Sequence, residues 1–185
     1  MSTFLIPRRN FIKIDDNEEY QRVTVQIHGK GIILRDKVLG GQVKTKKQQL
    51  TKPYDLIVAE IDAKVGGFGI ISPHLANSIV SNHYFLYEIN KNIVDPDFLS
   101  FYLKTGKPTA DLLSKGFVKG SHNYASIRAE HFLELEMPIP PLNAQHDLIE
   151  LQNNVIMLQN IERSIKQGID SILRSTYEIL YETSN

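Results

Sequence analysis

An apolar repeat near the end of the chain constrains the fold more strongly than any other feature of these 185 residues. Ten positions between 148 and 179 follow an alternating spacing of three and four residues, and eight of the ten are apolar. This heptad pattern predicts a coiled-coil-type α-helix with one continuous apolar seam. The polar positions of the repeat are Glu162 and Thr176. The apolar seam positions are Leu148, Leu151, Val155, Leu158, Ile165, Ile169, Ile172 and Ile179.

The helix that this repeat predicts is long. Asn143 suits the N-cap position and no proline follows Pro141, so we expect a helix from about Ala144 to the last few residues. At a rise of about 1.5 Å per residue, this helix is roughly 55–60 Å long. Gly168 inside it costs about 1 kcal/mol relative to alanine, which a coiled coil tolerates better than an isolated helix. The seam favours a partner helix from another chain, because no second helix of comparable length is predicted. The alternative is a helix folded back onto its own domain.

The preceding part of the chain predicts a domain of strands and short helices. Hydrophobic residues make up 42% of the sequence and charged residues 23%, values that are typical of globular proteins. Asp95 as N-cap before Pro96 predicts a helix that stops at Gly106. Hydrophobic alternation and turn residues predict strands at 20–27, 56–65 and 133–139, a polar loop at 44–49 and a short helix at 108–116. We therefore expect an α+β fold, with a mixed-sheet domain over 1–141 and the long helix over 142–185.

Charge divides the chain into a basic part and an acidic part, whose net charges of +6 and −6 sum to zero. Residues 1–129 carry 18 Lys and Arg against 12 Asp and Glu, whereas residues 130–185 carry 3 against 9. A basic domain suits a polyanionic partner, although ordinary solvated surface explains a net charge of this size equally well.

Composition also indicates the cellular compartment in which we expect the protein. The absence of cysteine excludes disulfides and thiolate chemistry and fits a reducing compartment. No apolar run approaches 18 residues and the start of the chain lacks the apolar core of a signal peptide, so we expect a cytoplasmic protein without a membrane partner.

The sequence carries no motif that predicts a catalytic or metal site. It contains no phosphate-binding P-loop, no H-E-x-x-H pair and no G-x-S-x-G turn. The nearest alternative is a magnesium-dependent nuclease of the P-D…(D/E)-x-K type, suggested by Asp55, Asp62 and Lys64. If 55–64 is one strand, the two carboxylates lie on opposite faces and roughly 23 Å apart, too far to share a metal ion.

Two positively charged segments have residue types that suit nucleic acid without catalysis. Lysine and arginine neutralise phosphates, whereas asparagine, glutamine, serine and tyrosine can contact base edges. For any single residue, ordinary surface decoration explains a loop lysine as well. Phosphate contacts are expected from Lys44, Lys46, Lys47, Lys115, Lys119 and Arg128, and base contacts from Gln48, Ser121, His122, Asn123 and Tyr124.

Several stretches, taken in order, resemble the specificity subunits of type I restriction-modification systems. Thr45 to Gln48, Asp55 to Lys64 and Gly67 to Ile71 are similar to the central part of their target-recognition domains. The segment from Pro138 to Leu142, followed by Gln145, resembles the junction where such a domain continues into its long helix. The resemblance extends over nearly the whole chain, but it includes one domain and one helix where family members usually have two of each.

The resemblance implies a non-catalytic subunit that reads double-stranded DNA and recruits methyltransferase subunits. It implies that no cofactor is bound by this chain and that S-adenosylmethionine, used to methylate adenine, belongs to the partner. A second copy of the chain would close the helical seam in an antiparallel, two-fold arrangement, as the paired helices of the family do, giving a homodimer that reads two identical half-sites. Restriction subunits are further expected partners. A coiled-coil adaptor that binds only protein, or an inhibitor of a related restriction complex, remains an alternative.

Overall fold

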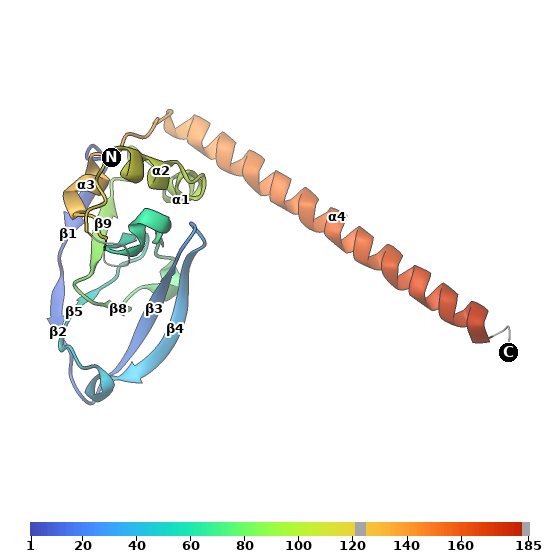
Figure 1. The fold of residues 1–185 in the computed structure, drawn as a ribbon, viewed down its shortest axis with the longest axis horizontal. Coiled ribbons are helices and arrows are strands. Elements are labelled where there is room, and N and C mark those ends of the chain that lie inside the picture. The colour runs from blue at the N-terminus through green and yellow to red at the C-terminus, as the bar shows by residue number, and fades with distance from the viewer. Residues whose placement is uncertain (121–124, 183–185) are drawn as a thin grey trace. The chain divides into compact units, whose positions relative to one another are not determined.

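The computed structural model describes residues 1–120 and 125–182, which form two compact units. The first unit is Met1–Gln145 and the second is His146–Asn185 (Figure 1). Each unit is described separately below. Ser121, His122, Asn123 and Tyr124, from which base contacts are expected, lie outside the described residues.

The first unit is built on two β-sheets. One sheet is antiparallel and has the strand order β1-β9-β6-β7, and the other has the order β2-β5-β8-β3-β4. The second sheet is mixed, because β3 and β8 run parallel where Arg22 pairs with Ile79. The strands are β1 (Leu5–Arg8), β2 (Phe11–Lys13), β3 (Glu19–Gln26), β4 (Gly31–Leu39), β5 (Lys47–Leu50), β6 (Leu56–Ala59), β7 (Phe68–Ile70), β8 (Ile79–Val80) and β9 (Tyr84–Ile89).

The main apolar core lies where strands of the two sheets meet. Val23 and Val25 of β3 and Val80 of β8 pack with Ile57 of β6 and Leu86 of β9, and all five are buried. Burial of this kind stabilises a fold by about 1.5–3 kcal/mol for each large apolar side chain. The two sheets are therefore layers of one domain, not two separate domains.

Short helices complete the first unit. They are η1 (Gly40–Gln42), η2 (Asp62–Val65), η3 (Pro73–Leu75), α1 (Pro96–Lys104), α2 (Lys107–Ser114) and α3 (Ala129–Leu133). The N-cap of α1 is confirmed, because Asp95 accepts hydrogen bonds from the backbone amides of Asp97 and Phe98. Helices α1 to α3 gather at one end of the unit (Figure 1). The predicted helix at 108–116 is confirmed as α2.

Three sequence predictions for strands and loops are wrong. Residues 47–50 of the expected loop form β5, which pairs with β2 on one side and β8 on the other. The expected strand over 56–65 ends at Ala59 and continues as η2, after which Gly66 adopts a φ of 79° that a side chain would strain. The expected strand at 133–139 is absent from the described residues, where α3 ends at Leu133 and no regular element follows until residue 142.

The long helix is confirmed as α4 (Leu142–Glu182), a single helix of 41 residues. It begins two residues before the predicted start, so Asn143 lies inside the helix and is not its N-cap. All eight apolar seam positions are exposed, with between 42% and 66% of their surface accessible. The fold class predicted from the sequence, a mixed-sheet α+β domain followed by one long helix, is confirmed, whereas pairing of the seam with another helix stays a prediction.

Candidate nucleic-acid interface

The side chains of the first predicted segment, residues 44–49, lie in different environments. Lys44 and Lys47 are exposed, and the Nζ of Lys47 lies 4.6 Å from the centre of the Phe11 ring. Lys46 instead bonds the Asp16 carboxylate and the Gly40 carbonyl oxygen, the latter at 2.7 Å, so its ammonium holds the turn at η1 in place. Gln48 is buried and its Nε2 donates to the Thr45 carbonyl oxygen at 2.7 Å. Gln48 therefore presents no side chain for base contact in this conformation.

The second segment closes on itself through backbone hydrogen bonds. Lys119 and Ser126 exchange two of them, N to O at 3.0 and 2.9 Å, and so pair the described residues on either side of 121–124. Lys119 and Arg128 have exposed side chains. The Nζ of Lys115 lies 3.6 Å from a Glu136 carboxylate oxygen, so its charge is partly balanced.

One hollow of about 550 Å³ lies between the neighbourhoods of the two segments, and we call it the Arg9 hollow. Lys47, Phe11 and Ala129 are among its lining residues, and Ala129 directly follows Arg128 in the sequence. Arg9 and Asn82 are exposed residues on its lining. Sequence positions more than 80 residues apart, Lys47 and Ala129, are thus brought to a single surface feature.

The lining of the Arg9 hollow combines both signs of charge with aromatic rings. Arg9 and Lys47 supply cations that can neutralise phosphates, and Tyr84 supplies an aromatic surface. Glu60 is also in the lining, and its Oε2 is hydrogen-bonded to the Nδ1 of His83 at 2.9 Å. A carboxylate in such a place can accept a hydrogen bond from the amino group of cytosine.

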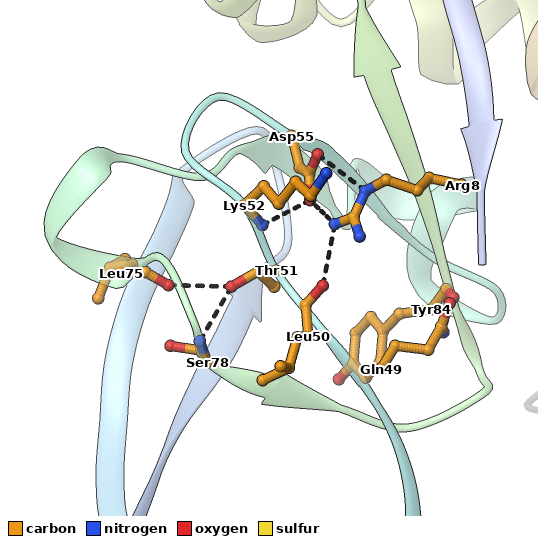
Figure 2. Close-up of polar contacts among 9 residues, drawn as sticks. All are labelled: Arg8, Gln49, Leu50, Thr51, Lys52, Asp55, Leu75, Ser78 and Tyr84. Atoms are coloured by element: carbon orange, nitrogen blue, oxygen red, sulfur yellow. Dashed lines mark hydrogen bonds and ion pairs between the residues drawn. The ribbon is translucent and has the colours of Figure 1, made fainter. Parts of the chain in front are cut away.

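A network of polar contacts holds Arg8, the residue that precedes Arg9 in the sequence (Figure 2). Arg8 bonds the Asp55 carboxylate through Nε and Nη2, and the same Nη2 donates to the Leu50 carbonyl oxygen at 2.9 Å. Asp55 also accepts from the Lys52 backbone amide at 2.7 Å. Arg8 thus joins β1 of one sheet to β5 of the other. Burial raises the pKa of the Asp55 carboxyl above its ordinary value, and the Arg8 guanidinium opposes that rise.

Two further contacts fix the walls of the hollow. The Nε2 of Gln49 donates to the carbonyl oxygens of Ser81 and Tyr84, at 3.1 and 2.9 Å, and so ties β5 to the turn before β9. The Tyr87 hydroxyl donates to the Ala129 carbonyl oxygen at 2.9 Å, and its ring stacks against Phe132 of α3. Burial raises the pKa of the Tyr87 hydroxyl well above its ordinary value. Both side chains therefore position backbone; neither is expected to contact DNA itself.

Sequence reasoning missed Arg9, Phe11 and Asn82 as candidate contacts. The run Arg8-Arg9-Asn10 carried a usable signal, since two adjacent cations and an amide interrupt an apolar start. Asn82 carried no such sequence signal, because its place in the lining of the hollow depends on β9 lying beside both β1 and β6. Only the three-dimensional pairing of distant strands shows it.

The sequence argument against the nuclease, which placed Asp55 and Asp62 on one strand, has a wrong premise, but other contacts in the structure oppose this alternative. Asp55 and Asp62 do not share a strand, because β6 ends at Ala59. The Asp55 carboxylate is bound by Arg8, and the Lys64 ammonium donates to the Ala125 carbonyl oxygen at 3.0 Å. Within residues 1–120 and 125–182, no group of three or more His, Asp or Glu side chains could hold a metal ion.

A two-sheet α+β domain that continues into one long helix is the fold of a specificity subunit of type I restriction-modification systems. The chain belongs to this family: the family model of the type I restriction modification DNA specificity domain matches residues 6–171. No curated protein matches the chain in sequence. No helix among the described residues is both long and apolar enough to cross a membrane.

Two solved structures share the fold. One is the crystal structure of the HsdS subunit from Thermoanaerobacter tengcongensis, with a TM-score of 0.68 and 15% sequence identity. The other comes from work on the structural basis underlying complex assembly and conformational transition of the type I R-M system. It matches with a TM-score of 0.68 and 16% sequence identity. Each alignment covers 88% of this chain and 42% of the solved chain. The chain therefore spans less than half the length of either solved chain.

Proposed function

We propose that the chain is a DNA-binding specificity subunit of a type I restriction-modification complex. The unit Met1–Gln145 reads one half-site in double-stranded DNA, and α4 recruits methyltransferase subunits and pairs with a second copy. The chain itself is non-catalytic, and S-adenosylmethionine is bound by the methyltransferase that methylates adenine. Restriction subunits join the same assembly.

The Arg9 hollow is the observation that supports this proposal beyond family membership. Arg9 and Lys47 border it, and Arg128 directly precedes a residue of its lining. Cations spread along such a surface contact phosphates and set the register of the protein on the duplex. Asn82 and Glu60 bring an amide and a carboxylate, the groups that read adenine and cytosine edges in the major groove. Ser121 to Tyr124, expected to read bases, lie outside the described residues.

The proposal predicts the form of the DNA target. Two identical copies held by their helices read two identical half-sites, so the target is an interrupted palindrome. Methylation mapping in cells that carry the chain and its methyltransferase reports that target directly. An asymmetric two-part target would contradict the homodimer and require a different second recognition domain.

A binding titration tests whether the Arg9 hollow faces DNA. With the mapped target and a scrambled duplex of equal length, Arg9→Ala should weaken binding to both by a similar factor, because a phosphate contact carries no sequence information. Asn82→Ala should weaken binding to the mapped target only. Lys30→Ala is the matched control, since Lys30 is exposed at the β3–β4 turn and is not part of the hollow. Wild-type affinity in both hollow variants would place the interface elsewhere.

The same titration separates the competing functions. A specificity subunit binds the mapped target without turnover, and its affinity does not require magnesium. A nuclease cleaves DNA when magnesium is added. An adaptor or inhibitor that acts only through its helix shows no dependence on DNA sequence.

A further inference from the structure

Glu60 places a negative charge in a lining whose cations attract DNA. Arg9 and Lys47 of the Arg9 hollow are exposed and positively charged, whereas Glu60 and Glu130 carry negative charges in the same lining. A carboxylate repels phosphate, so it lowers the affinity for DNA of any sequence unless a base supplies a hydrogen-bond donor for it. In an interface with DNA, such a residue therefore contributes to specificity rather than to overall affinity.

The backbone of Glu60 is held on both sides. Its amide donates to the His83 carbonyl oxygen at 2.9 Å, and its carbonyl oxygen accepts from the Ile127 amide at 3.1 Å. Glu60 also directly follows β6, whose last residue pairs with the first residue of β9. The backbone of Glu60 is therefore tied to the turn that carries Asn82.

The side chain of Glu60 has one oxygen that is held and one that remains available. Oε2 lies 2.9 Å from the Nδ1 of His83, and a carboxylate only accepts hydrogen bonds, so Nδ1 carries the proton in this contact. Oε1 has no hydrogen-bond partner among the residues that the structure describes, and 31% of the side chain is exposed. Glu60 thus presents to the hollow one acceptor whose direction is set by His83.

Glu130 has the same charge without this support. Its side chain is exposed, and within the described part of the chain it makes no hydrogen bond or ion pair. An exposed carboxylate that nothing holds keeps its rotamer freedom, so it presents no acceptor in a fixed direction. The lining therefore contains one carboxylate that is oriented and one that is not.

An acceptor with a fixed direction distinguishes the base edges of the major groove. The group at position 4 of a pyrimidine is an amino donor in cytosine and a carbonyl acceptor in thymine, and guanine presents only acceptors. Adenine also carries an amino group, but its N7 acceptor lies beside that group and repels a carboxylate. Cytosine is therefore the base whose edge suits Glu60 best.

We propose that Glu60 reads a cytosine of the half-site, by accepting a hydrogen bond from the cytosine amino group at Oε1, and that His83 is the positioning residue that directs this oxygen. The inference rests on the proposed function for the presence of DNA at the Arg9 hollow, and it adds the base and the residue that selects it.

A titration of the full chain measures this selection. The duplexes are the mapped target and copies of it in which each C·G pair of the half-site is changed in turn to T·A. For one such pair, wild type should bind the changed duplex at least about tenfold more weakly, as expected when a base contact is lost. We call the Kd for that changed duplex divided by the Kd for the mapped target the cytosine ratio.

Glu60→Gln should remove or reverse this preference. Its amide oxygen can still accept from His83, which turns the amide nitrogen toward the base as a donor. A donor suits the thymine carbonyl and not the cytosine amino group. The cytosine ratio should therefore fall by at least about tenfold.

Glu130→Gln is the matched control, because it removes the same charge from the same lining. It should change the Kd for every duplex by a similar factor and leave the cytosine ratio within about twofold of wild type. This comparison separates base selection from the general effect of charge on binding to DNA.

Two variants of His83 test its positioning role. His83→Phe removes the donor that holds Oε2 and should lower the cytosine ratio at least about threefold. His83→Asn keeps a donor near the place of Nδ1 and should preserve the ratio within about twofold. If His83 served only the fold, both variants would alter the Kd for all duplexes and neither would alter the ratio.

The outcomes separate this inference from the proposed function. A wild-type chain that does not distinguish the mapped target from a scrambled duplex contradicts the proposed function, and the inference falls with it. Sequence-specific binding with an unchanged preference in Glu60→Gln at every C·G pair, or a half-site that contains no C·G pair, overturns the inference and leaves the proposed function standing.

Discussion

Arg8 and Asp55, 47 residues apart in the sequence, form an ion pair that is almost fully buried, with 11% and 2% of the two side chains exposed. Arg8 lies at the end of β1, and Asp55 directly precedes β6, two strands that are separated in the sheet by β9. The same guanidinium reaches β5 through the Leu50 carbonyl oxygen. One cation therefore holds together three segments, two of which, β1 and β5, contribute residues to the lining of the Arg9 hollow.

Arg8→Met should destabilise the fold strongly. The change leaves the Asp55 carboxylate buried with the Lys52 amide as its remaining hydrogen-bond donor among the described contacts. Removing one partner of a buried ion pair costs about 3–5 kcal/mol, because the other charge stays desolvated. Urea unfolding of the full chain measures this loss.

The matched control for this change is Arg22→Met. Arg22 pairs with Asp36 at 2.6 Å, but 31% and 37% of the two side chains are exposed. An exposed pair contributes only about 0–1 kcal/mol. Similar losses in the two variants would contradict a special role for the Arg8–Asp55 pair.

Tyr87 should make the fold sensitive to alkaline pH. Its pKa is raised by burial, so the folded chain keeps the hydroxyl proton at pH values where the unfolded chain, with a tyrosine pKa of about 10, loses it. The unfolded state then binds fewer protons, and the free energy of unfolding falls as pH rises above about 10. Tyr87→Phe should reduce that slope, as measured by urea unfolding at several pH values between 8 and 11.

Tyr87→Phe also separates the effect of titrating the Tyr87 hydroxyl from the effect of packing its ring. The ring still stacks on Phe132, while the hydrogen bond to the Ala129 carbonyl oxygen is lost. We expect a loss of about 1 kcal/mol at pH 7, where the hydroxyl is neutral in both states. If the free energy of unfolding of Tyr87→Phe falls with pH above 10 as steeply as that of wild type, other tyrosines carry the whole effect.

Local signals in the sequence predicted the elements whose determinants are local. The Asp95-Pro96 start of α1 and the heptad repeat of α4 depend on neighbouring residues along one helix, and both are confirmed. The strand predicted over 56–65 was too long, because alternation continues through residues 60–65 although the chain there turns as η2. The segment at 47–50 shows no apolar period, and it is a strand because β2 and β8 pair with it.

The candidate interface was predictable only in part, for the same reason. Lys47 and Arg128 belong to basic runs that a reader of the sequence can see. Arg9, Asn82 and Glu60 come from three separate segments, and their meeting depends on pairing between distant strands. Gln48 has the chemistry of a base reader but is buried by the strand pairing that the sequence did not reveal.

Gln145 should be essential for anchoring the first turn of α4. This buried side chain accepts a hydrogen bond from the Asp95 amide at 2.8 Å and donates to the carbonyl oxygens of Ile93 and Pro140 at 2.9 and 2.8 Å. Gln145→Leu leaves these three backbone groups without this partner, at about 1–3 kcal/mol for each group that stays buried. Urea unfolding should show a loss of at least about 2 kcal/mol. Gln152→Leu, on the same helix, should change stability by less than about 0.5 kcal/mol.

Lys46 and Lys47 should differ in their effects on DNA binding although they are neighbours. The Lys47 ammonium lies over Phe11 at the edge of the Arg9 hollow, whereas that of Lys46 is held by Asp16 and the Gly40 carbonyl oxygen. Lys47→Ala should weaken binding to all DNA sequences and reduce the slope of log K against log salt by about 1, as expected for one lost phosphate contact.

Lys46→Ala is the internal comparison for this prediction. It should leave the salt slope within about 0.3 of wild type, because its charge is already balanced by Asp16 in the free chain. Binding titrations at four or more salt concentrations measure both slopes on the same duplex. A reduction of about 1 in Lys46→Ala with none in Lys47→Ala would move the phosphate contact from the Arg9 hollow to the η1 turn.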